Sequence, residues 1–257
     1  MNNTFNLHRF TLLLKRQWLE FGKIFLITLL VATGVIVAFY GFTLLPLEEL
    51  GYVPRKLSFR EPLFFIFGFL FISIIASSYF AHLGQKSKAI IDLLIPASTF
   101  EKFLAGFFFT SILSVLAFIL IFIITDWAFI AYIKSYFKTG NVKELAEVEM
   151  FFNKNNINSF APLYLAPFMV TSIFLLGSAY FNRFHYIKTA ISVMVYSGIL
   201  WYILFNIAEI IFSGKTSINR GFNTGKDNME WMLFAIIAAF TFIVFYITYV
   251  RLKEKEV

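Results

Sequence analysis

The sequence predicts an all-α membrane protein with six transmembrane helices. Hydrophobic residues make up 59% of the 257-residue chain and charged residues only 14%, whereas about a quarter of a soluble domain is charged. At about 1.5 Å per helical residue, a stretch of roughly twenty residues crosses a hydrocarbon layer of about 30 Å, and a helix satisfies its own backbone hydrogen bonds there. Six such stretches contain no charged side chain: residues 24–45, 62–81, 103–125, 161–181, 189–208 and 231–250.

The rest of the composition fits one membrane domain over residues 1–257. The chain has no Cys, which excludes disulfides and thiolate chemistry. No small-residue cleavage site follows the first apolar run, so we expect no removed signal peptide. The net charge of +7 is typical of basic residues at helix ends that face anionic headgroups. We therefore expect membrane lipid as a partner, and not nucleic acid.

Residues 1–22 show an amphipathic helical pattern before the first span. Such a helix lies in the membrane interface, where it either serves as an anchor only or also docks a cytoplasmic partner. One face carries Leu7, Phe10, Leu14, Trp18 and Phe21, and another carries Arg9, Arg16 and Glu20.

The connection between the second and third spans predicts a short helix over residues 86–95. Ala89, Ile90, Leu93 and Leu94 are apolar, whereas Lys86, Lys88 and Asp92 are polar. Pro96 ends this helix because it cannot continue the backbone hydrogen-bond ladder.

A capping box is expected directly after Pro96. The Ser98 hydroxyl accepts from the backbone N–H of Glu101, while the Glu101 carboxylate accepts from the N–H of Ser98. This cap fixes the direction in which the third span begins. The arrangement suits a segment that transmits a push from a cytoplasmic partner, and an ordinary connection between two helices is the alternative.

These features together resemble the type-2 permeases of ABC exporters. The resemblance consists of an amphipathic N-terminal helix, six spans, and the strings LLIPAS and EKFL between the second and third spans. In that family a run of Leu is followed by Pro, a small residue and Ser, with Lys opening the third helix. The matching positions are Leu93, Leu94, Pro96, Ala97, Ser98 and Lys102.

The resemblance implies a permease subunit that moves its substrate by alternating access. Its short helix would fit a groove on a separate ATP-binding subunit, which would carry the ATP and Mg, and the N-terminal helix would border the same contact. Because six helices form half of such a pathway, we expect a dimer with itself or with a sister permease. A bacterial cytoplasmic (inner) membrane is the implied location. The implied coupling residues are Lys86, Ile90, Asp92, Leu93, Leu94, Pro96, Ser98 and Glu101.

Two segments depart from the family pattern. Residues 212–230 form a polar loop where the family often has re-entrant helices, and the connection over residues 134–160 is long, with an amphipathic helix expected near residues 142–152. The substrate stays open among lipid, peptide, antibiotic and sugar, although the Phe-rich interior favours an amphipathic one.

The chain is not expected to be an enzyme or to hold a cofactor or metal. Residues 221–227, the string closest to a phosphate-binding loop, have three residues between the glycines instead of four and place Asp227 after Lys226. His8, His82 and His185 have no partner at helical spacing, so they do not predict a metal site.

A few polar residues and one proline stand out within the spans. Asp126 and Glu209 follow the third and fifth spans, where they serve as interfacial caps or line an outer vestibule. Asn206 is expected to face another helix or the pathway. Pro167 should kink the fourth span. Small residues are expected at helix contacts: Gly34, Ala38 and Gly41; Ser73, Ser77 and Ala81; Gly177 and Ser178; Ala235 and Ala239.

Charge favours cytoplasmic termini by a narrow margin. With both termini inside, twelve of the 22 Lys and Arg residues lie on the inner side and ten on the outer side. The alternative class is an ATP-independent membrane protein, either a secondary carrier or a sensor or scaffold. A carrier is expected to have internal repeats and charged groups near the bilayer midplane. An intramembrane enzyme requires paired carboxylates or a His/Glu cluster, and neither pattern is present in the sequence.

Overall fold

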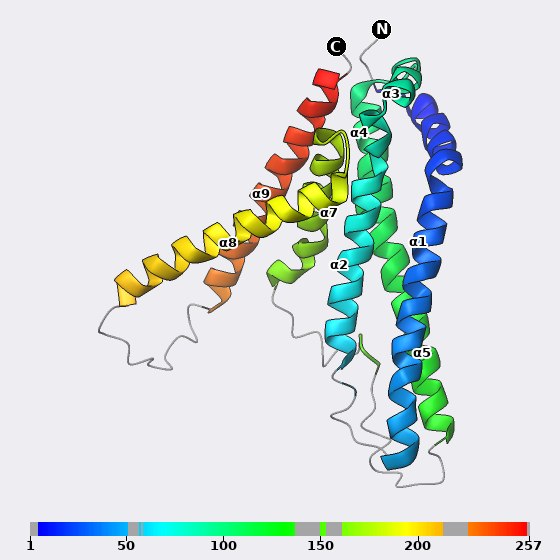
Figure 1. Cartoon of the computed structure of the whole chain (residues 1–257), viewed down its shortest axis with the longest axis vertical. Helices are drawn as coiled ribbons and strands as arrows, with labels where there is room; N and C mark the ends of the chain where they lie inside the picture. Colours follow the sequence, from blue (N-terminus) through cyan, green and yellow to red (C-terminus); the bar gives the residue numbers. More distant parts are fainter. Residues whose placement is uncertain are drawn as a thin grey trace. The chain divides into compact units, whose positions relative to one another are not determined.

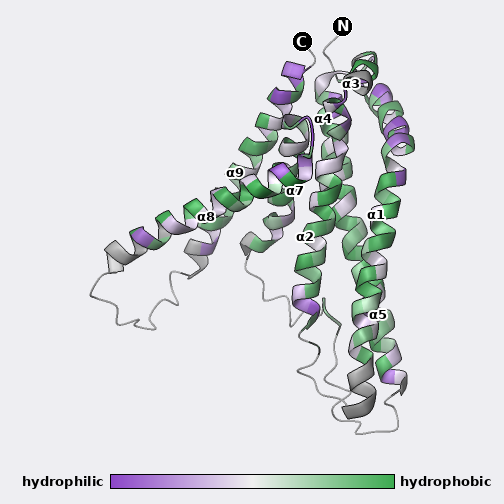
Figure 2. Cartoon of the chain, viewed as in Figure 1, coloured by the Kyte–Doolittle hydropathy of each residue, from purple (hydrophilic) through white to green (hydrophobic). Residues whose placement is uncertain are grey.

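A computed structural model describes residues 5–50, 57, 59–136, 150–152, 161–212 and 226–255. Within these ranges the regular elements are all helical, and Figure 2 shows apolar residues along most of their length. The predicted all-α class is confirmed by six helices that are long and apolar enough to cross a membrane. They are Leu7–Leu44, Arg60–Tyr79, Thr99–Ser135, Leu163–Tyr180, His185–Ile207 and Glu230–Lys255.

The chain divides into two compact units, and the boundary falls within α2. Unit 1 comprises Met1–Ile75 and Ala97–Ser159, and unit 2 comprises Ala76–Pro96 and Phe160–Val257. The elements in chain order are α1 (Leu7–Leu50), α2 (Arg60–Tyr79), the 3₁₀ helix η2 (Ala81–Gly84), α3 (Lys86–Leu93), α4 (Thr99–Phe107), the π-helix η3 (Phe108–Leu113), α5 (Ser114–Tyr136), the 3₁₀ helix η5 (Ala161–Leu165), α7 (Ala166–Tyr180), α8 (His185–Phe212) and α9 (Lys226–Lys255).

The first helix differs from the expected pair of a separate interfacial helix and a span. Residues 7–22 are the first turns of α1, which continues without a break for 44 residues. No Pro lies between residues 7 and 45, and Gly22, at the expected end of the interfacial helix, lies against the Trp18 ring, 3.2 Å from the position that its Cβ would take. Leu13 and Phe21 are buried within unit 1.

The third span contains a π-helical segment that the sequence pattern did not predict. Between α4 and α5, η3 widens the helix by one residue over Phe108–Leu113. A π segment leaves some carbonyls without their usual partners. Side-chain hydroxyls compensate here: Thr110 Oγ1 donates to the Gly106 carbonyl at 2.8 Å, and Ser114 donates to the Thr110 carbonyl. Both hydroxyls are fully buried.

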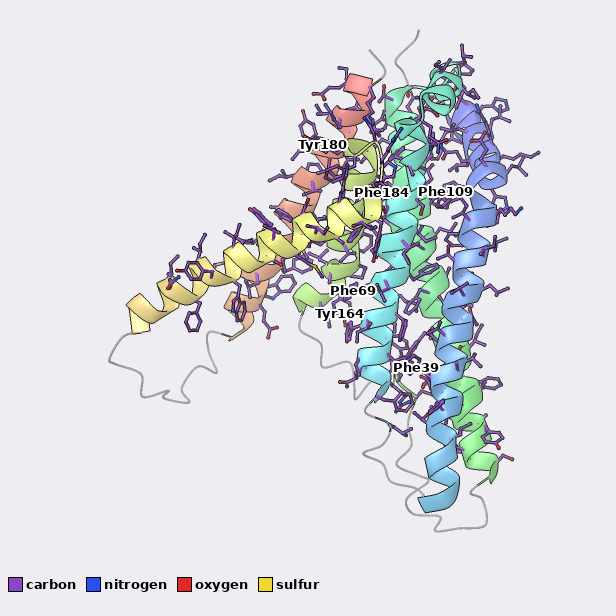
Figure 3. All side chains as sticks on the ribbon, viewed as in Figure 1. Phe39, Phe69, Phe109, Tyr164, Tyr180 and Phe184 are labelled. Carbon is purple, nitrogen blue, oxygen red and sulfur yellow. The ribbon has the colours of Figure 1, made fainter. Side chains whose placement is uncertain are left out.

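Aromatic rings fill the interior of unit 1, in which α1, α2 and α5 run side by side (Figure 1). Phe71 on α2 lies 6.1 Å from Phe25 on α1 and 5.9 Å from Phe118 on α5, measured between ring centroids. Lipid tails are as apolar as these side chains, so the association depends on close packing rather than on removal from water. Figure 3 labels Phe109, another buried ring of this unit.

In unit 2, α7 packs against both α8 and α9. The approach of α8 depends on Gly177, because a Cβ there would overlap the side chain of Thr189. Pro167 lies in the first turn of α7, after η5, and not in a helix interior. The prediction that Pro167 kinks the interior of the fourth span is therefore wrong, because a proline in the first helical turn removes no intrahelical hydrogen bond.

The small-residue stripes have different environments. Ser73 and Ser77 on α2 are buried, as is Ser178 on α7, so these positions are covered within the described chain. Gly34 and Gly41 on α1 have no atom of the described residues within 4 Å of the position of a Cβ. This face of α1 is therefore open within the described chain.

Candidate functional site

The start of the third span is capped as predicted. Ser98 has extended backbone geometry, with φ −72° and ψ 153°. Its hydroxyl accepts from the backbone N–H of Glu101 at 3.2 Å, and its own N–H donates to Glu101 Oε2 at 2.9 Å. These two bonds form the capping box that sets the direction of α4.

The second oxygen of Glu101 holds the beginning of α1. Oε1 accepts from the backbone N–H of Asn6 at 2.8 Å and from Arg9 Nη2 at 3.1 Å. The Glu101 side chain is 0% exposed, and a buried carboxylate needs this many donors to offset its lost hydration. We call Asn6, Arg9, Ser98 and Glu101 the α1–α4 clamp. The sequence revealed only its Ser98–Glu101 half.

The short helix between the second and third spans is present as α3, Lys86–Leu93, two residues shorter than predicted. Leu94 has α-helical backbone geometry but serves as the C-cap, and Pro96 follows in an irregular segment. Ile90 is 59% exposed and Leu94 77% exposed. The side chains of Lys86 and Leu93 lie outside the described part of the chain.

Asp92 is on the more covered side of α3. Its Oδ1 lies 3.7 Å from Nε2 of His82 on η2, and His82 Nδ1 lies 3.0 Å from the carbonyl of Tyr79. The sequence did not reveal Asp92 as a neighbour of His82, because the two residues come together only in the folded arrangement of η2 and α3. Asp92 thus faces η2, and the exposed apolar residues of α3 lie on the surface of unit 2.

The predicted coupling residues belong to both units. Ile90, Asp92, Leu94 and Pro96 are part of unit 2, whereas Ser98 and Glu101 are part of unit 1. The peptide bond between Pro96 and Ala97 connects the two groups. The structure therefore groups Ser98 with Glu101 in the clamp, and it places the exposed apolar residues on a separate helix immediately before it.

Asp126 forms a second polar cluster in unit 1. Its Oδ1 accepts from Tyr40 Oη at 2.9 Å and from Arg60 Nη1 at 3.1 Å, and its Oδ2 accepts from the backbone N–H of Phe151 at 2.9 Å. Asp126 is 2% exposed. The structure thus places it in a buried ion pair with Arg60.

The other two candidates for an outer pathway are on α8. Asn206 Nδ2 donates to the carbonyl of Tyr202, one turn earlier in the same helix, at 2.9 Å. This bond satisfies one amide hydrogen without a second helix. The side chain of Glu209 lies outside the described residues.

Glu101 and Asp126 lie on either side of the charge-free stretch of the third span, residues 103–125. They are separated by 25 positions in the sequence, which corresponds to about 35 Å of helix and slightly exceeds a hydrocarbon thickness of about 30 Å. Both polar clusters can therefore lie at the edges of an apolar layer while the aromatic interior of unit 1 lies between them.

Among the described residues, no group of three or more His, Asp or Glu side chains is arranged to hold a metal ion. No protein-family model, curated protein or solved structure matches the chain.

Replacing Glu101 with Gln should destabilise the α1–α4 clamp. The change removes the charge that pairs with Arg9 and turns an amide NH₂ toward N–H donors, so we expect the free energy of unfolding to fall by about 3 kcal/mol. Thermal unfolding in detergent gives this difference, and hydrogen exchange should show lost protection in the first turns of α1. Glu20→Gln is the control, because Glu20 forms an exposed pair with Arg16 that contributes less than about 1 kcal/mol. Equal losses for both variants would contradict the clamp.

The Asp126 cluster predicts a non-additive pair of substitutions. Arg60→Met leaves a buried carboxylate without its cation and should lower stability by about 3 kcal/mol, whereas the double variant Arg60→Met/Asp126→Leu should lose less than Arg60→Met alone. Glu61→Gln, at an exposed position in the same turn of α2, should change stability little. Additive losses measured by thermal unfolding would show that the two residues do not act as a pair.

Proposed function

We propose that this chain is the transmembrane permease subunit of an ABC-type exporter. In this proposal a separate ATP-binding subunit binds ATP and Mg and hydrolyses the nucleotide, and the permease changes its access to the two sides of the membrane in response. Two permeases, identical or sister chains, would enclose the pathway. The six apolar helices support the membrane-embedded part of this proposal.

The observation that carries the proposal is the position of α3 directly before the clamp. At eight residues, α3 is about 12 Å long, too short to cross a bilayer. Its exposed Ile90 and Leu94 are one helical turn apart, so they offer an apolar contact of the size that fits a groove on a partner. Asp92, on the side held by His82, keeps the helix attached to unit 2.

The clamp supplies a route by which a force on α3 would reach the membrane helices. A displacement of α3 passes through Pro96 and Ala97 to Ser98, whose two hydrogen bonds to Glu101 hold the first turn of α4. Glu101 also binds Asn6 and Arg9, so the first turns of α1 would move together with α4. Two of the spans would thus respond to a partner that binds α3.

Leu94→Asp should abolish copurification with the ATP-binding subunit. A carboxylate placed in an apolar contact without a partner costs several kcal/mol, enough for at least a tenfold loss of association. Pull-down of the chain from native membranes, followed by an ATPase assay, measures how much ATP-binding subunit remains associated. Leu94→Met, which keeps an apolar side chain, is the matched control and should retain the partner. If no ATP-binding protein accompanies the wild-type chain, or if Leu94→Asp retains it, the carrier or scaffold alternative replaces this proposal.

The proposed orientation predicts the labelling of single cysteines, which can be introduced freely because the chain has none. In intact cells an impermeant thiol reagent should modify Lys143→Cys and Lys215→Cys. It should miss Ser87→Cys and Lys253→Cys until the membrane is permeabilised. The opposite pattern would place α3 outside the cell and overturn the proposed contact with an ATP-binding subunit.

A further inference from the structure

Basic side chains gather in unit 2 where α7 ends, α8 begins and α9 ends. Figure 3 labels Tyr180 and Phe184 in this region. Arg251 on α9 lies over the Tyr180 ring, 5.1 Å from its centroid, and Lys188 on α8 lies 5.7 Å from the centroid of Phe181. Lys255 lies close enough to Arg251 and His185 that their positive charges repel one another. We call His185, Lys188, Arg251 and Lys255 the basic cluster.

Several nitrogen atoms of this cluster are covered but have no hydrogen-bond acceptor. Within the described ranges, Lys255 Nζ, Arg251 Nε and His185 Nδ1 are buried atoms without a partner. The acidic residue that pairs with the cluster there is Glu254, through Nη1 of Arg251. Aromatic rings thus position two of the cations, and among the described residues of the cluster the carboxylate of Glu254 pairs with Arg251.

An ammonium group that is removed from water and lacks an acceptor is unfavourable. An anion with several acceptor oxygens would satisfy Lys255 and Arg251 together, and a phosphate offers this geometry better than one carboxylate does. Basic pockets between transmembrane helices at a membrane surface are suited to phosphorylated headgroups. The apolar surface beside the cluster also fits a lipid, because Ile187 and Ile191 on α8 and Ile247 on α9 are exposed.

We propose that the basic cluster is a binding site for a phosphate group, either that of a lipid headgroup or phosphate free in solution. Lys255 and Arg251 donate to its oxygens, and Lys188 adds charge at the rim. A bound lipid would place its acyl chains along the exposed faces of α8 and α9. This site is independent of the transport proposal, because it involves neither α3 nor the clamp.

The test uses the full-length chain in detergent and counts bound lipid by native mass spectrometry. Dioleoyl phosphatidic acid is compared with dioleoylglycerol, which has the same acyl chains but no phosphate. The wild type should bind phosphatidic acid at least about tenfold more tightly than dioleoylglycerol, and Lys255→Met should lower that affinity about tenfold, the effect of one charge-assisted hydrogen bond. Lys255→Arg keeps the charge and should keep the binding.

Lys253→Met is the matched control, since Lys253 is an exposed residue on the same turn of α9; it should change the affinity less than about twofold. Lys188→Met is a second site variant at an exposed position and should weaken binding without affecting folding. Three outcomes would each overturn a lipid site. They are equal losses of affinity for Lys253→Met and Lys255→Met, unchanged binding by both Lys255→Met and Lys188→Met, and equal affinity of the wild type for the two lipids.

Inorganic phosphate distinguishes the two sources. If the cluster takes a lipid headgroup, millimolar phosphate should neither raise the thermal unfolding temperature nor displace phosphatidic acid. If it takes free phosphate, that salt should raise the unfolding temperature of the wild type but not that of Lys255→Met. If phosphate does not stabilise the protein and the protein does not prefer phosphatidic acid to dioleoylglycerol, the basic cluster is not a phosphate site.

Discussion

Two buried carboxylates, Glu101 and Asp126, connect the helices of unit 1 on either side of the charge-free stretch of the third span. A charged group in an apolar layer is stable only when donors from the protein replace its lost hydration. Glu101 takes these donors from the start of α1 and from Ser98, and Asp126 takes them from Tyr40 on α1, Arg60 on α2 and the backbone of Phe151. Each carboxylate therefore fixes the positions of several segments at once.

Many of the described contacts in the interior between these carboxylates are between aromatic rings. Ring contacts such as Phe71 with Phe118 tolerate small changes in helix position, because dispersion forces have little directionality. The π segment η3 provides the one local deviation that we see along the described third span, and its carbonyls are compensated by Thr110 and Ser114. The Phe109 ring of this segment stacks on Trp18 of α1, with the centroids 6.2 Å apart. The widened helix is thus matched to the first turns of its neighbour.

The same arrangement explains how a peripheral contact would influence a membrane helix in the proposed permease. A capping box alone fixes one helix end, but Glu101 uses its second oxygen for α1. The first turns of two spans are consequently coupled through a single side chain. The basic cluster of unit 2 has the opposite character, since its buried nitrogen atoms have no acceptor within the described chain. The first feature is a completed internal network, whereas the second is the site that we propose for a phosphate group.

Local patterns in the sequence determined the fold class and several boundaries. Charge-free stretches defined the six spans, and the i, i+3 spacing of Ser98 and Glu101 defined the cap, because these signals depend on neighbouring residues alone. The same local information placed a short helix before Pro96, although it extended that helix two residues too far.

Only the tertiary structure decided which distant groups meet. Arg9 and Glu101 are 92 positions apart, and Arg60 and Asp126 are 66 positions apart. No helical periodicity encodes such a pair. Three further features likewise depend on how backbone hydrogen bonds are satisfied after the helices have packed. They are the continuity of α1, the π segment and the position of Pro167 in the first turn of α7. The sequence by itself thus determined where apolar helices occur, and three-dimensional packing decided how their polar groups are satisfied, because hydrogen bonds between remote residues exist only once those helices lie side by side.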